Sequence, residues 1–400
     1  MEGLKLFLLM IKIKNIVYIL VWCILLAGYP FVFTYMFGYP NIIVILCLTF
    51  ILMLICLKNN VSLTKEYGIL LFIMFSFFVC ALIYHENTLY LSNIVHILIV
   101  YIIFTALTRI ASVEEFSKQF IYAITIIAVL GAVGSVLVYS FGLDPIFQYT
   151  QQDGRLANAY FLTVTNTPGP PSPHPIIRYS GYFDEPGALA FFVMIALCLN
   201  RLLLKNNKIE NALLIAPLLT FSMAHIITTV CFYVFFRIRK MWHFILAAIC
   251  IFAIVFAIYS LKDSEYGRLY ELSMERFEME DGDVKGNTRD NIPEAIKAFN
   301  KNPILGVGID EDSSLSNNPF SILAQNGIIG YIIIQIIYFY IFIKVIISRS
   351  HNKWTVLKCM ILLLMNLQQR PFSTNIVYFT AMLLLFMMSD RILTAKYREV

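Results

Sequence analysis

Apolar runs long enough to cross a bilayer recur along the whole of this 400-residue chain, separated by short polar turns and two long polar loops. A bilayer-spanning helix needs about 20 predominantly apolar residues. The pattern predicts spans at 15–36, 41–57, 67–84, 89–109, 118–142, 186–203, 241–260, 319–347, 354–369 and 374–390. With the hairpin described next, they predict an all-α, polytopic integral membrane protein of about twelve transmembrane helices.

One apolar run, 211–236, is too long for one span and too short for two ordinary ones. Basic residues flank both of its ends, with Lys205 before it and Arg237 after it. Because Lys and Arg concentrate on the cytoplasmic side, a single crossing would place one basic end outside. A hairpin of two short helices keeps both ends inside. We therefore predict a hairpin whose tip, 220–225, faces outward.

The same rule orients the rest of the chain. Both termini lie inside, and residues 143–183 and 261–318 form two long outer loops within a single transmembrane domain that covers 1–400. Residues 262–312 carry seven basic and thirteen acidic side chains, whereas the whole chain has a net charge of +5. This asymmetry indicates membrane topology and does not suggest nucleic-acid binding. We expect short helices inside both loops, in the second one over 264–280 and after Thr288.

Composition excludes a soluble domain, because 59% of the residues are hydrophobic and only 14% are charged. All eight cysteines lie in apolar stretches, which favours buried apolar side chains over disulfides or a cysteine metal site. The first apolar run lacks a small-residue cleavage site, so we interpret it as a retained helix and not as a signal peptide.

The stretch 178–187 closes the first outer loop and opens a membrane helix. Five prolines within 167–175 exclude a helix before it. Arg178 and two acids, Asp184 and Glu185, therefore lie where water meets lipid, a costly place for charge without a partner or a substrate. Acids before a helix that begins with proline are also ordinary N-terminal signals. The general-base and helix-cap interpretations of the two acids both stay open.

The outer face collects the candidate chemistry. Arginine binds phosphate oxygens with two parallel hydrogen bonds and without a metal, so converging arginines would fit a lipid diphosphate. The alternative is that each arginine is solvated or pairs with a loop acid. No zinc-ligand spacing such as His-x-x-x-His occurs, and we expect no metal and no cofactor. The candidate residues are Arg155, His174, Arg178, Tyr179, Asp184, Glu185, Ser222, His225, Arg276, Arg289, Asn317, Asn318 and Arg370.

Four stretches in this order resemble motifs of the O-antigen polymerase and O-antigen ligase family. Residues 178–187 resemble the Arg, Gly, aromatic and Glu-Pro run that opens a central helix, and 218–225 resemble a Thr-x-Ser tip between two helices. Residues 289–308 resemble an arginine, a helix and a Gly-x-Gly block. Residues 317–330 resemble a closing Asn and a Gly-Ile-Ile-Gly helix.

Two positions depart from the family pattern. Ligases usually have His-Asn where this chain has Ser316-Asn317, and an arginine often follows the tip serine where this chain has Met223. The first departure argues against a ligase and for a Wzy-type polymerase.

The resemblance implies a GT-C-like enzyme of the bacterial inner membrane that joins oligosaccharide repeat units linked to undecaprenyl diphosphate, by metal-independent inverting transfer at the periplasmic face. Glu185, Arg178, Arg289 and His225 would be catalytic, and the other candidates would bind substrate. A chain-length regulator would be a partner. The alternatives are a ligase that transfers the glycan to lipid A core, or a flippase or other transporter of lipid-linked oligosaccharides. A transporter should carry charge near the midplane, where this chain has almost none.

Overall fold

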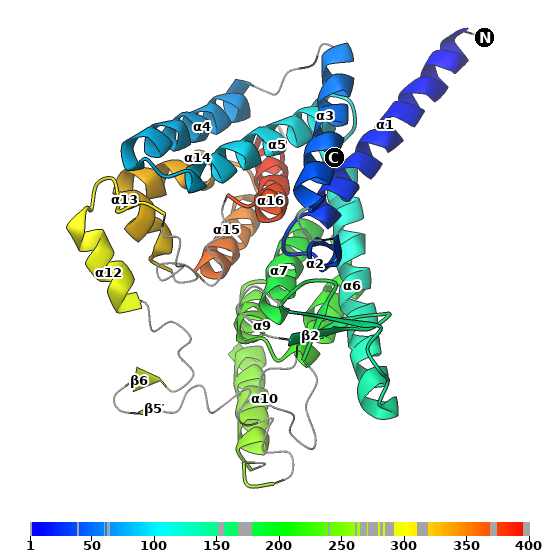
Figure 1. The fold of residues 1–400 in the computed structure, drawn as a ribbon. Coiled ribbons are helices and arrows are strands. Elements are labelled where there is room, and N and C mark those ends of the chain that lie inside the picture. The colour runs from blue at the N-terminus through cyan, green and yellow to red at the C-terminus, as the bar shows by residue number, and fades with distance from the viewer. Residues whose placement is uncertain are drawn as a thin grey trace. The chain divides into compact units, whose positions relative to one another are not determined.

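The computed structural model of the chain describes residues 2–37, 40–59, 61, 65–150, 156–166, 178–238, 241–260, 262–264, 270, 279–280, 283–284, 292–309, 319–368 and 374–394. Most of these residues are helical (Figure 1). The chain divides into two compact units. Unit 1 comprises Met1–Ala123, Ile195–Asn206 and Asn291–Val400, and unit 2 comprises Ile124–Met194 and Asn207–Asp290.

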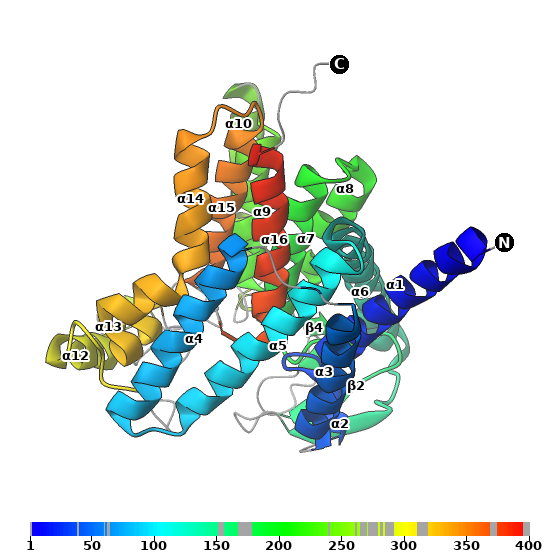
Figure 2. The ribbon, with the colours of Figure 1, turned by 90° about the horizontal axis from the view of Figure 1, so that it is seen from above.

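The first part of unit 1 consists of α1 (Glu2–Ala27), α2 (Phe33–Phe37), α3 (Pro40–Lys58), α4 (Lys65–His85) and α5 (Leu89–Arg109). The last three match the predicted spans within two residues, and α4 lies beside α5 (Figure 2). The first span, expected at 15–36, begins earlier and ends at Ala27. Pro30 has no amide proton and restricts Tyr29, so the helix cannot continue through them.

The second part of unit 1 consists of α12 (Ile292–Lys301), α13 (Ser321–Ile334), α14 (Ile336–Ile347), α15 (Lys353–Leu367) and α16 (Ile376–Thr394). Helix α12 is the helix expected after Thr288. The single span expected at 319–347 is instead two helices, α13 and α14, bent by 44°. Helices α14, α15 and α16 pack against one another (Figure 2).

Five helices among the described residues are long and apolar enough to cross a membrane: 41–58 of α3, α4, α5, α6 (Val113–Phe141) and α16. The bent pair α13 and α14 would make six. The shorter apolar helices Pro186–Leu202 and Ala224–Phe236 fall below the length of a full span. The structure is thus that of a mostly helical membrane protein, and the predicted count of twelve spans is not confirmed.

Burial separates the core of unit 1 from its lipid-facing surface. In the apolar part of α16 that could span a membrane, 83% of the residues are buried. In the corresponding parts of α3 and α4, 28% are buried. Ile43 and Phe72 are about two-thirds exposed, as suits side chains that face lipid. At one end of α16, Asp390 accepts a hydrogen bond of 2.7 Å from Lys344 of α14, so that the buried acid is paired.

The first outer loop, which belongs to unit 2, differs from expectation. It contains no short helix among its described residues but an antiparallel sheet in the order β1-β2-β3-β4 (Figure 1). Along β2, buried and more exposed residues alternate, which is typical of a half-buried strand. Val164 and Thr165 are β-branched, which favours a strand. The strands are β1 (Phe147–Thr150), β2 (Leu156–Ala159), β3 (Val164–Asn166) and β4 (Arg178–Gly181).

Helical segments make up most of the rest of unit 2. Helix α6 enters this unit at Ile124. It begins five residues before the predicted span, with Glu114 and Glu115 in its first turn, where acids are favourable. The later elements are α7 (Pro186–Leu202), which passes into unit 1 at Ile195, α8 (Asn207–Ile215), the 3₁₀ helix η1 (Ala216–Thr220), α9 (Met223–Phe236), α10 (Met241–Ser260), β5 (Met279–Glu280) and β6 (Asp283–Val284).

Candidate functional site

Arg178, the first candidate, is the first residue of strand β4, which precedes helix α7. Gly181 ends this strand with φ at +61°, and a Cβ there would lie 2.6 Å from Cγ2 of Ile127. Only glycine fits such a position without strain. Helix α7 then begins at Pro186, where a missing amide proton costs nothing. The predicted transition from loop to helix is therefore found where the sequence placed it.

The hairpin predicted for 211–236 is present as α8, η1 and α9. Arg237, just after α9, donates from Nε to Oε1 of Glu210 at 2.6 Å and from Nη2 to Oδ1 of Asn211 at 3.0 Å. Both acceptors lie in α8. The two ends of the run therefore meet, which is what distinguishes a hairpin from a single crossing.

Arg178 is joined to the tip of this hairpin. Its Nε donates to the carbonyl oxygen of Thr220 at 3.1 Å. The hydroxyl of Thr220 donates to Pro217 at 2.6 Å and accepts from the amide of Ser222 at 3.1 Å. Phe221, between Thr220 and Ser222, has φ at +50°. The bond through Nε orients the planar guanidinium, whose donors form a rigid fork.

Two further candidates are buried in the structure. His225 is fully buried, with Nε2 at 3.2 Å from the carbonyl oxygen of Leu214 and at 3.1 Å from the Thr229 hydroxyl. Tyr179 is also fully buried, and its hydroxyl donates to Ala128 at 3.1 Å. Burial raises the pKa of this phenol. Both side chains are therefore buried and within hydrogen-bond distance of other residues.

The two acids lie where a helix cap would. Asp184 is buried and Glu185 is half-buried. The carbonyl oxygen of Glu185 accepts from the amide of Ala188 at 3.0 Å, which makes Glu185 the residue at the entry to α7. This backbone position suits a helix cap. The Glu185 carboxylate is seven residues from Arg178 along the chain.

Seven of the sequence candidates lie outside the described residues. They are Arg155, His174, Arg276, Arg289, Asn317, Asn318 and Arg370.

A second contact between motif-like stretches lies in unit 1, where the segment 303–308, which includes a turn at 303–305, fits into a break in α13. The break is at Gly327, which has φ at +63° and ψ at −172°. A helix break leaves orphan carbonyl and amide groups on either side, and the segment satisfies four of them. The bonds run from Val307 to Ala324 (2.9 Å), Gly308 to Gln325 (3.0 Å), Ile328 to Pro303 (2.9 Å) and Ile329 to Ile304 (3.2 Å).

Two glycines make this close approach possible. A Cβ on Gly306 would collide with the backbone of Gln325, and one on Gly327 would collide with the backbone of Ile304. Both glycine-rich stretches are visible in the sequence, but their contact with one another is not. The signal that the sequence offered for this contact was the spacing of its glycines.

The described residues contain no group of three or more His, Cys, Asp or Glu side chains that could hold a metal ion. No known protein family's sequence profile matches the chain, and a search of curated proteins finds no significant match. Its function therefore has to be inferred from the residues and their arrangement.

Proposed function

We propose that this chain is a membrane glycosyltransferase that polymerises lipid-diphosphate-linked oligosaccharide units, as O-antigen polymerases do. The observation that carries the proposal is that the four motif-like stretches meet in pairs. In unit 2, Arg178 of the first stretch bonds to Thr220 of the second. In unit 1, Gly308 of the third bonds to Gln325 of the fourth.

The reaction needs positive charge where a diphosphate leaves. A hydroxyl oxygen of the acceptor attacks the anomeric carbon of the donor, the bond between that carbon and the diphosphate oxygen breaks, and the diphosphate departs with the electron pair. Arg178, oriented by its bond to Thr220, stabilises the growing negative charge. Removing one such preorganised donor typically costs about a hundredfold or more in rate. Arg289 would act with it.

A base takes the proton from the attacking hydroxyl. Glu185 is our first choice because it is half-buried at the head of α7, whereas Asp184 and His225 are buried. A carboxylate can accept this proton if it lies within hydrogen-bond reach in the bound complex. His225 is given a structural role, since its Nε2 lies within hydrogen-bond distance of Leu214 and Thr229.

The proposal extends to location and partners. The enzyme would lie in the inner membrane of a bacterium, with both termini in the cytoplasm and the two long loops in the periplasm, following the distribution of basic residues. Both donor and acceptor would be glycans on undecaprenyl diphosphate, and a chain-length regulator would act with the enzyme.

A lipopolysaccharide ladder from a strain that lacks this chain tests the proposal against both alternatives. Loss of a polymerase leaves core plus one repeat unit, loss of a ligase leaves bare core, and loss of a flippase leaves almost no repeat unit. We expect core plus one repeat, and we expect a plasmid copy of the chain to restore long glycans. Bare core or an unchanged ladder would rule the polymerase out.

A further inference from the structure

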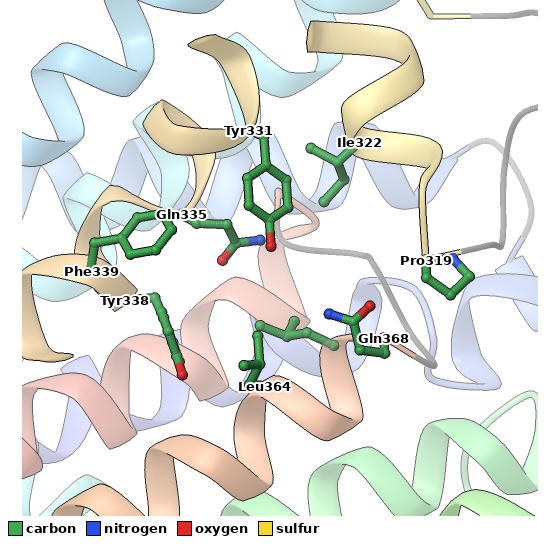
Figure 3. Close-up of a pocket in the computed structure, with 9 residues that line it drawn as sticks. Pro319, Ile322, Tyr331, Gln335, Tyr338, Phe339, Leu364 and Gln368 are labelled. Atoms are coloured by element: carbon green, nitrogen blue, oxygen red, sulfur yellow. The ribbon is translucent and has the colours of Figure 1, made fainter. Parts of the chain in front are cut away.

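A small pocket in unit 1 lies beside the bend between α13 and α14. It has a volume of about 150 Å³. Its walls include Tyr331, Gln335, Tyr338, Phe339, Leu364 and Gln368 (Figure 3). Non-helical backbone within a membrane span is tolerated where it is covered by protein or lines a cavity. Substrate sites of membrane proteins often form at such interrupted helices.

The polar atoms in this pocket are neutral and converge. Figure 3 shows the Tyr331 hydroxyl and the amides of Gln335 and Gln368 directed into it. A primary amide both donates and accepts, and a phenol does the same. None of the nine lining residues carries a formal charge. A phosphate would therefore enter without a cation to pair with, at a high cost in desolvation.

The other walls combine two aromatic side chains, Tyr338 and Phe339, with four aliphatic ones, and Tyr338 is held in place. The Tyr338 hydroxyl donates to the carbonyl oxygen of Met360 at 3.3 Å, and its ring stacks on Phe342 with centroids 6.3 Å apart. Aromatic faces are electron-rich and attract the positive edges of C–H groups. A sugar ring offers such C–H groups on its faces and hydroxyls around its rim, which matches both features of the pocket.

We propose that this pocket binds one neutral sugar residue of the glycan substrate. The assignment rests on the proposed function, which supplies the glycan. The volume falls below the roughly 300–1,000 Å³ of pockets for drug-sized ligands, so the pocket holds one ring and not an oligosaccharide. An isoprenoid tail fits less well, because it offers no hydrogen bonds to the hydroxyl and the two amides that are directed into the pocket.

Saturation-transfer NMR on the purified full-length chain tests this without any enzymatic reaction. The probes are methyl glycosides of a neutral hexose, a 6-deoxyhexose and an N-acetylhexosamine, with glucose 1-phosphate and farnesyl phosphate as charged and isoprenoid comparisons. The detergent is an alkyl amine oxide, because maltoside headgroups are themselves sugars. We expect at least one neutral glycoside to give a saturation-transfer signal. Neither glucose 1-phosphate nor farnesyl phosphate should displace that glycoside.

Gln335→Leu and Tyr331→Phe should each weaken that binding, by up to about tenfold for one lost hydrogen bond. Tyr122→Phe, at an exposed position of α6, should leave it unchanged. Gln368→Leu changes an exposed side chain and should also weaken binding without affecting folding. Absence of glycoside binding, binding that these variants do not alter, or displacement by farnesyl phosphate would overturn the assignment. Bare core or an unchanged ladder from a strain that lacks the chain would instead remove the proposed function.

Discussion

The guanidinium of Arg237 closes the α8–α9 hairpin through a hydrogen bond of 2.6 Å from Nε to Oε1 of Glu210. The Glu210 side chain is 1% exposed, and this bond pairs its charge. One ion pair thus joins the start of the hairpin to its end. The same contact holds the two ends of this apolar run close together, as a hairpin requires.

Removing this arginine should destabilise unit 2. Arg237→Ala removes an ion-pair partner from a buried carboxylate, which typically costs about 3 kcal/mol or more. Thermal unfolding of the purified chain should show a lower midpoint. The double variant Glu210→Leu with Arg237→Met replaces the pair with apolar groups and should recover most of the loss. An unchanged midpoint in Arg237→Ala would mean that the ion pair does not hold the hairpin.

The hairpin tip should be reachable from outside the cell. Ser222 itself is only 4% exposed, so Leu218, which is 42% exposed, is the better reporter. In a background without native cysteines, Leu218→Cys should react with an impermeant thiol reagent added to intact spheroplasts. Asn207→Cys, at the exposed start of α8, should react only after permeabilisation. The reverse labelling pattern would contradict the predicted topology.

Arg178 should be required for long glycans. Arg178→Ala should leave the protein in the membrane and reduce the ladder to core plus one repeat, because the leaving diphosphate loses its guanidinium. Arg178→Lys should restore it only partly, since a point charge lacks the fork geometry. Arg109→Ala, at an exposed position at the end of α5, is the matched control. A normal ladder from Arg178→Ala at equal protein level would exclude Arg178 from the proposed site.

Glu185→Gln separates the two interpretations of this acid. An amide keeps the size of the side chain and much of its capacity to cap α7, but it cannot take a proton. If Glu185 is the base, the ladder should collapse while protein level and unfolding midpoint stay close to those of the wild type. If long glycans persist, Glu185 is a helix cap and the base lies elsewhere.

Gly327→Ala should disrupt the junction between 303–308 and α13. Gly327 has φ at +63°, and a Cβ would collide with the backbone of Ile304. The strain of this backbone conformation alone is typically about 1 kcal/mol or more. Gly68→Ala is the control, since a Cβ there meets nothing within 4 Å and alanine favours a helix. Equal stability and activity of the two variants would show that the junction tolerates a side chain.

The sequence by itself determined the features that depend on local pattern. The apolar run at 89–109 predicted α5 to the residue. The helical spacing after Thr288 predicted α12, and Pro186 marked the start of α7. The basic flanks of 211–236 predicted the hairpin. Hydrophobic length, periodicity and charge distribution act over a few turns of chain, so they can be read without knowledge of distant neighbours.

Only the tertiary structure decided which distant groups meet. The first outer loop pairs as a sheet because β1–β4 find partners in one another, a choice that three- and four-residue strands do not reveal in sequence. The bond from Arg178 to Thr220 joins residues 42 positions apart, and the docking of 303–308 at Gly327 joins residues 17 to 25 positions apart. Their physical cause is the need of every buried amide and carbonyl for a partner, and that partner is chosen by the packed fold.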